Sequence, residues 1–167
     1  VIVINPGEML AQARDSQRMN DLSTVRDAVT TYIVQSTAAI DLGACATSGR
    51  CTVNPGAGLG PFTADCGAAQ VGRGVDGTGW VDVNFTTISG GSPIPSLPLD
   101  PTNSGSYFYG YACSESGGAY TFELDTRLES AKFVPKMTSD GGSRNTCGTP
   151  TAATCFYEIG TKPGLDL

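Results

Sequence analysis

An uninterrupted segment without glycine or proline, from Glu8 to Ser36, constrains this chain more than any other feature. Asn5, Pro6 and Gly7 stand directly before it. Proline is tolerated in the first turn of a helix, and an acidic side chain there interacts favourably with the helix dipole. The sequence therefore predicts a helix from Pro6 to about Ser36, roughly 46 Å long at 1.5 Å per residue. Because that length exceeds the diameter of a small domain, we expect the helix to project or to belong to an assembly.

The predicted helix has one apolar face. Its members recur at steps of three and four residues: Leu22, Val25, Val29, Tyr32 and Ser36. This spacing is typical of a helix that packs one side against a core. Charged side chains, Arg14 and Arg18 among them, occupy the remaining positions, and Asp15 can support the helix by pairing with Arg18 three residues later.

The composition excludes several classes of function. The chain has 167 residues, which fits one domain, and contains no histidine. Ser-His-Asp and Cys-His catalysis and imidazole metal ligands are therefore excluded. Ten Lys and Arg stand against 16 Asp and Glu, so nucleic acid is not an expected partner, since such binding depends on clustered basic residues. We predict that the protein is not an enzyme.

An even number of cysteines predicts disulfide bonds and a location outside the reducing cytosol. The six are Cys45, Cys51, Cys66, Cys113, Cys147 and Cys155. No pair has the C-x-x-C spacing of zinc ribbons, and thiolate metal binding or buried free thiols are the alternatives. From neighbourhood along the chain we predict Cys147–Cys155 and Cys45–Cys51, which leaves Cys66–Cys113.

The rest of the chain predicts an α+β fold in which the long N-terminal helix packs on one face of a small antiparallel sheet. Alternating apolar residues predict strands at 80–85, 107–111 and 120–124, a turn at Gly117-Gly118 and a closing strand at 155–160. A helical turn is expected at 125–133. Residues 1–40 then form the helical part, 41–79 a Cys- and Gly-rich loop pinned by disulfides, and 80–167 the sheet head. Together they make one globular domain.

Several segments of the chain, in this order, are similar to a known family. The stretch from Asn5 to Arg18, followed by Asp21-Leu22, resembles the N-terminal helix of bacterial type IV pilins and type II secretion pseudopilins. The 97–101 segment LPLDP and the 107–111 segment YFYGY are similar to the proline–aspartate link and tyrosine strand of pseudopilin-like subunits. The likeness extends through 128–130, 140–142 and 157–160, whereas the loop at 43–79 matches nothing in the family.

This resemblance implies a structural protein without catalytic residues. Family members wait in the inner membrane, held by an apolar helix, and then assemble with identical subunits into an extracellular helical filament that serves adhesion, motility or secretion. Apart from the apolar residues 1–4, the family's membrane segment is missing, so we expect it to precede Val1. The expected filament contacts are Pro6, Arg14, Arg18 and Leu22, and the alternative for Arg14 and Arg18 is a solvated helix face.

Three other hypotheses concern binding or catalysis. Asp140, in the sequence Asp-Gly-Gly, is a weak calcium candidate, because secretion pseudopilins bind calcium near this region; a plain glycine turn is the alternative. Asp125 and Glu129 form a candidate carboxylate pair for glycoside hydrolysis. Trp80, Tyr107, Tyr109 and Tyr111 could stack on sugars, which makes a secreted carbohydrate-binding or adhesive module the alternative function; core packing is the other interpretation of these aromatics.

Overall fold

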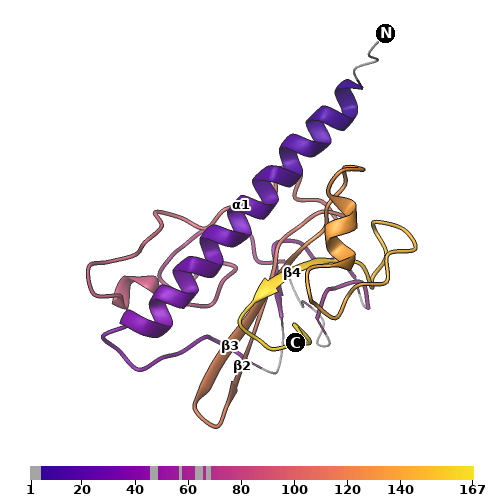
Figure 1. Cartoon of the computed structure of the whole chain (residues 1–167). Helices are drawn as coiled ribbons and strands as arrows, with labels where there is room; N and C mark the ends of the chain where they lie inside the picture. The colour runs from indigo at the N-terminus through magenta and orange to yellow at the C-terminus, as the bar shows by residue number, and fades with distance from the viewer. Residues whose placement is uncertain (1–4, 46–48, 57, 63–65, 67–68) are drawn as a thin grey trace.

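The regular structure consists of a long helix and an antiparallel sheet, as the sequence predicts (Figure 1). The sheet has four strands, and the first of them lies within the 41–79 segment, which the sequence predicts to be loop throughout. The computed structural model describes residues 5–45, 49–56, 58–62, 66 and 69–167. Within them lie helix α1 (Pro6–Gln35) and the 3₁₀ helices η1 (Phe85–Thr87) and η2 (Val134–Thr138). The strands, which neighbour one another in chain order, are β1 (Arg50–Cys51), β2 (Gly110–Ser116), β3 (Ala119–Thr126) and β4 (Tyr157–Gly160).

Helix α1 has the boundaries that its end residues favour. The Asn5 side chain accepts hydrogen bonds from the backbone amides of Gly7 and Glu8, at 3.1 and 3.3 Å, and so satisfies two donors that a helix start leaves unpaired. At the other end, the Ser36 amide donates to the Tyr32 carbonyl at 2.9 Å. The N-terminal end of α1 extends beyond the rest of the molecule in Figure 1.

The predicted apolar face of α1 is confirmed from Leu22 to Tyr32, whereas Ser36 lies just after the helix as its C-cap. The buried residues in the C-terminal half of α1 are Leu22, Val25, Ala28, Val29 and Tyr32. They join a core cluster with the sheet residues Tyr111, Cys113, Phe122 and Leu124. These sheet residues alternate along β2 and β3, so they define the sheet face that packs against α1.

The opposite sheet face is also buried. A second cluster covers it, made of Cys51, Phe62, Cys66, Phe108, Ala112 and Phe156. Two residues on β3 that point to this side, Glu123 and Asp125, are buried together with Glu158 on β4. The sheet is therefore sandwiched between α1 and the loop segments, and acidic side chains lie on the loop side.

The turn between β2 and β3 is the predicted one. Gly117 and Gly118 both have positive φ, 60° and 83°, and Ser116 pairs with Ala119 across them. Two consecutive positive φ values are the requirement of a two-residue hairpin turn, and glycine meets it without strain.

The strand predicted at 80–85 is wrong. This segment is loop that ends in η1, although Trp80, Val81, Val83 and Phe85 are all buried. Its backbone finds single partners in a neighbouring loop instead of a strand: the Trp80 amide donates to the Gly72 carbonyl and the Phe85 amide to the Val75 carbonyl. The alternation here reflects burial of one side of a loop, since within the described residues this segment has β-type pairing only through the isolated bridge between Asp76 and Asn84.

Three other element boundaries need correction. The strand expected at 107–111 begins only at Gly110, because Tyr107 and Ser104 exchange backbone hydrogen bonds in a tight turn. Instead of a helical turn starting at Asp125, β3 continues to Thr126, and 3₁₀ helix follows at Val134–Thr138. The closing strand starts at Tyr157, two residues later than predicted.

All six cysteines form disulfides, but two of the three predicted pairings are wrong. The bonds are Cys45–Cys113, Cys51–Cys66 and Cys147–Cys155, of which only the last matches. The sheet explains the error, because Cys113 belongs to the cluster on the α1 side and Cys51 to the cluster on the other side. Cys45 and Cys51 are close in sequence, yet they lie on opposite sides of the sheet.

Candidate functional site

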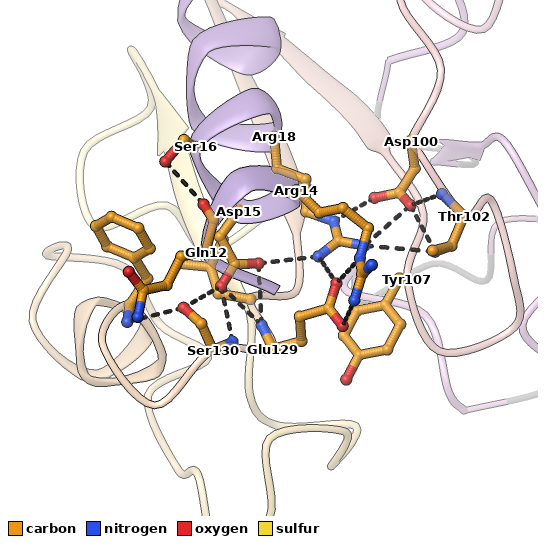
Figure 2. A network of polar contacts seen from close by, with 12 residues as sticks. Gln12, Arg14, Asp15, Ser16, Arg18, Asp100, Thr102, Tyr107, Glu129 and Ser130 are labelled. Atoms are coloured by element: carbon orange, nitrogen blue, oxygen red, sulfur yellow. Dashed lines mark hydrogen bonds and ion pairs between the residues drawn. The ribbon is translucent and has the colours of Figure 1, made fainter. Parts of the chain in front are cut away.

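An ionic network joins the first half of α1 to the head, and Arg18 lies at its centre (Figure 2). The Arg18 side chain has no exposed surface. Its Nε donates to Asp100 Oδ2 at 2.6 Å, and its Nη1 donates to Asp15 at 2.9 Å and to Glu129 at 2.6 Å. The guanidinium also lies 4.7 Å from the centre of the Tyr107 ring. One buried cation therefore connects α1 with the chain at 100 and at 129.

Asp15 extends the network along the segment 129–130. Its carboxylate accepts from the backbone amides of Glu129, at 3.0 Å, and Ser130, at 2.8 Å, and from the Ser130 hydroxyl at 2.6 Å. With Arg18 as a further donor, a fully buried carboxylate is satisfied on both oxygens. Asp15 thus fixes this loop on the surface of α1.

Arg14 adds a two-pronged ion pair nearer the surface. Its Nε and Nη2 donate to the two oxygens of Glu129, each at 2.7 Å, in the planar geometry that suits arginine and carboxylate. These hydrogen bonds lower the pKa of Glu129 against the opposing effect of its partial burial. Glu129 is shared by both arginines of the site.

Electrostatic complementarity holds the buried charges in their ionised forms. Burial by itself would raise the pKa of Asp100, but the hydrogen bonds and charge of Arg18 outweigh it, so the pKa is lowered. Burial would likewise lower the pKa of Arg18, and the bonds to Asp100, Glu129 and Asp15 raise it instead. Opposite charges at hydrogen-bond distance are the arrangement that makes such burial tolerable.

The expected filament contacts divide into two groups. Pro6 is exposed and Arg14 is partly exposed, so both remain predictions. Arg18 and Leu22 have no exposed surface, because they pack inside the subunit. The alternative of a solvated face is wrong for Arg18, and the Arg18 side chain is already engaged by partners of its own chain. Of its partners only Asp15 is local in sequence, and Asp100 and Glu129 lie far along the chain.

Exposed apolar residues near the start of α1 were missed at the level of sequence. Met9 is 59% exposed and Leu10 is 61% exposed, on the end of α1 that extends beyond the head (Figure 1). They lie outside the stripe that begins at Leu22, so periodicity does not assign them to the core. Their signal is the presence of two adjacent large apolar residues where that stripe predicts none.

The aromatic residues considered for sugar stacking belong to the core. Trp80, Tyr109 and Tyr111 are buried, and the Trp80 indole donates to the Pro98 carbonyl at 2.8 Å. Tyr107 is partly buried and carries the Arg18 guanidinium on its ring. These four residues therefore present no aromatic platform, and the core-packing interpretation is the correct one.

The acidic candidates occupy different places. Both oxygens of Asp140 are engaged, one by the Gly142 amide and one by the Glu158 amide, each at 3.0 Å, around Gly141 with φ 92°. This is the glycine-turn geometry. Asp125 and Glu129 do not form a pair: Asp125 lies on β3 beside Glu123 and Glu158, whereas Glu129 belongs to the arginine network.

No protein-family model, curated protein or solved structure matches the chain. The α+β architecture, with one N-terminal helix, a four-stranded antiparallel sheet and disulfides, is compatible with a pilin-like fold. In the part of the chain that the structure describes, no helix combines the length and the hydropathy that crossing a bilayer requires.

Proposed function

We propose that this protein is a structural subunit of an extracellular type IV-family filament, a pilus or pseudopilus, that assembles through α1 and serves adhesion, motility or secretion. The observation that carries the proposal is the N-terminal end of α1, which extends beyond the head while residues 14–32 of the same helix are held to it (Figure 1). The resemblance of the sequence to pilins is the reason for proposing a filament of the type IV family. In this proposal the subunit is anchored in the inner membrane before it joins identical copies.

The projecting end of α1 supports a contact with neighbouring copies. Met9 and Leu10 expose most of their side chains there, and exposed apolar groups on a helix gain free energy when another helix covers them. A contact between two different surfaces of identical subunits does not close on itself and therefore generates a helical filament. The projecting end meets another copy at a site away from its own head.

The ionic network supports a mechanical link between helix and head. Arg18 and Asp15 hold segments at 100 and 129–130 to the same turns of α1. Since the buried pairs have directional hydrogen bonds, we assign them the role of fixing the angle between the helix and the head, which a filament needs to be equal in every copy. The disulfides support an extracellular location, because each typically contributes about 2–4 kcal/mol to the stability of the folded chain.

Site-specific photocrosslinking in cells that produce the protein tests this proposal. A benzophenone amino acid at position 10 should crosslink to a second copy of the chain, recovered as a dimer band in the filament fraction sheared from the cells. Position 34 provides the matched control, because Val34 is also an exposed apolar residue of α1, at 75%, and lies at its opposite end. A probe at 34 should give far less of this dimer.

Two results would count against the filament. One is equal crosslinking from positions 10 and 34, which indicates non-specific association. The other is a protein that is absent from the sheared fraction and remains monomeric with either probe.

A further inference from the structure

Three acidic side chains meet on the side of the sheet that faces away from α1. Glu123 and Asp125 are two residues apart on β3, so they share a face, and Glu158 lies opposite Asp125 in the antiparallel pairing of β3 with β4. One carboxylate oxygen from each lies within 4.8 Å of the other two. None of the three is more than 1% exposed. We call Glu123, Asp125 and Glu158 the acidic triad.

The triad is only partly supplied with hydrogen-bond donors. Glu158 accepts from the Arg144 amide at 2.8 Å, and Glu123 accepts from the Leu167 amide at 3.0 Å. Asp125 is different: both of its oxygens are buried and neither accepts a hydrogen bond. Within the described residues, no Lys or Arg forms an ion pair with any of the three, although Arg144 lies near enough for its charge to act on Asp125.

Burial without a counter-charge is costly for carboxylates. Burial and the charges of Glu123 and Asp140 raise the pKa of Glu158 to about 8, and burial followed by the charges of Glu123 and Glu158 raises that of Asp125. Two kinds of partner relieve such a cluster: protons shared among the carboxyls, or a bound cation. A single shared proton engages one oxygen of Asp125, whereas a bound cation can engage both.

We propose that the acidic triad is a binding site for a hard divalent cation of the calcium, magnesium and manganese class. Its three carboxylates offer up to six oxygen ligands and no nitrogen or sulfur, which is the donor set that these ions prefer. Calcium places its ligands at about 2.3–2.6 Å, so ligands on opposite sides are about 4.6–5.2 Å apart, a span compatible with the triad. The ion supplies the partner that both oxygens of Asp125 lack.

The surroundings of the triad fit a structural ion. The site lies between β3 and β4, and a side chain at position 142 would collide with the Glu158 carboxylate, so Gly142 lets the 142–144 loop close over it. A bound cation would link β3 to β4 beneath that loop. The site differs from the Asp140 turn, where both carboxylate oxygens already accept backbone amides.

Isothermal titration of the chelator-treated, disulfide-intact protein with Ca²⁺, Mg²⁺ or Mn²⁺ tests the site directly. At pH 7.5 we expect one ion per chain for at least one of these metals. Thermal unfolding should shift upward by about 5–10 °C when the free metal is at a hundredfold excess over its dissociation constant. Bound Mn²⁺ should also lose the sharp electron paramagnetic resonance signal of the free ion.

Two near-isosteric variants locate the ion. Asp125→Asn should abolish the calorimetric signal and the thermal shift, and Glu123→Gln should do the same if Asp125→Asn fails to fold. Asp27→Asn is the matched control, because it removes an exposed carboxylate on α1, away from the triad; it should bind the ion with an affinity within about threefold of the unchanged protein. Asp140→Asn tests whether the ion lies at the glycine turn instead.

The proposal is overturned if none of the three ions binds at millimolar concentration. It is also overturned if Asp140→Asn abolishes binding while Asp125→Asn retains it, which would place an ion at the glycine turn. Equal binding by all variants indicates adventitious surface ions and contradicts the site as well.

Discussion

The two halves of α1 are held to the same head by different forces. Residues 22–32 bury an apolar stripe against the sheet, with Leu22, Val25 and Val29 fully enclosed. Residues 14–18 bury charge instead, with Asp15 and Arg18 equally enclosed and bonded to Asp100 and to the 129–130 segment.

This difference separates stability from orientation. Apolar contacts are favourable in many relative positions of two surfaces, so the stripe contributes free energy with limited directional control. The arginine and aspartate hydrogen bonds are satisfied only at one angle between α1 and the head, and the cost of burying charge makes other angles unfavourable. If the halves differ in this way, substitutions in them should have unequal effects on stability and on local hydrogen exchange.

The largest effect is expected for Arg18→Met. Removal of the guanidinium leaves Asp15 and Asp100 buried without their shared cation, so the free energy of unfolding should fall by about 3–5 kcal/mol. Urea unfolding followed by circular dichroism measures this. Arg26→Met is the matched control, because the Arg26–Asp27 pair is exposed and worth at most about 1 kcal/mol. Equal losses in the two variants would contradict a special role for Arg18.

A second prediction concerns the apolar half. Leu22→Ala should lower the free energy of unfolding by about 2–4 kcal/mol, because the side chain is fully buried and its removal leaves a cavity. Leu10→Ala removes the same atoms from an exposed position and should change stability by less than about 0.5 kcal/mol. Unlike Arg18→Met, Leu22→Ala should leave hydrogen exchange of the 129–130 amides close to that of the unchanged protein.

Acid should weaken the packing of residues 14–18 of α1 on the head before it weakens the packing of residues 22–32. The pKa values of Asp100 and Glu129 are lowered in the folded state, so the stability that these groups contribute is present above their unfolded values, near 4, and is lost as the pH falls through the folded values. Below pH 4 we expect hydrogen exchange at residues 14–18 to accelerate more than at residues 22–32. Equal acceleration in both halves would contradict the division.

The smallest effect is expected for Arg14→Gln. Its ion pair with Glu129 is partly exposed, with 32% of the Arg14 side chain accessible, and Arg18 still neutralises Glu129 when Arg14 is absent. The loss should be about 0.5–1 kcal/mol and should shrink in high salt. A loss as large as that of Arg18→Met would indicate that the two arginines act as one unit.

The same comparison explains what could be predicted from the sequence. The apolar half of α1 follows from periodicity alone, and the β2–β3 hairpin follows from Gly117-Gly118 between alternating segments. The burial of Arg18 could not be predicted, because its partners lie more than eighty positions away at Asp100 and Glu129. The predicted partners of Cys45 and Cys51 were wrong for a related reason. The side of the sheet on which each cysteine lies determines its partner, and distance along the chain does not.

The acidic triad also could not be predicted from the sequence. Glu123 alternates with Phe122 and Leu124 as an outward-facing strand residue does, and such residues are normally solvated. Only the second cluster, with Phe108 and Phe156 among its members, turns that face into an interior. A sequence that predicts a sheet with one covered face therefore misses every polar site on the other.

Electron cryomicroscopy of filaments sheared from cells that produce this protein tests the proposed function most directly. The filament account predicts α1 helices bundled along the axis, with Met9 and Leu10 against neighbouring copies and the Arg18 network intact between each helix and its own head. Filaments that lack this chain, or that contain it with α1 on the outside and Met9 and Leu10 in solvent, would contradict the account.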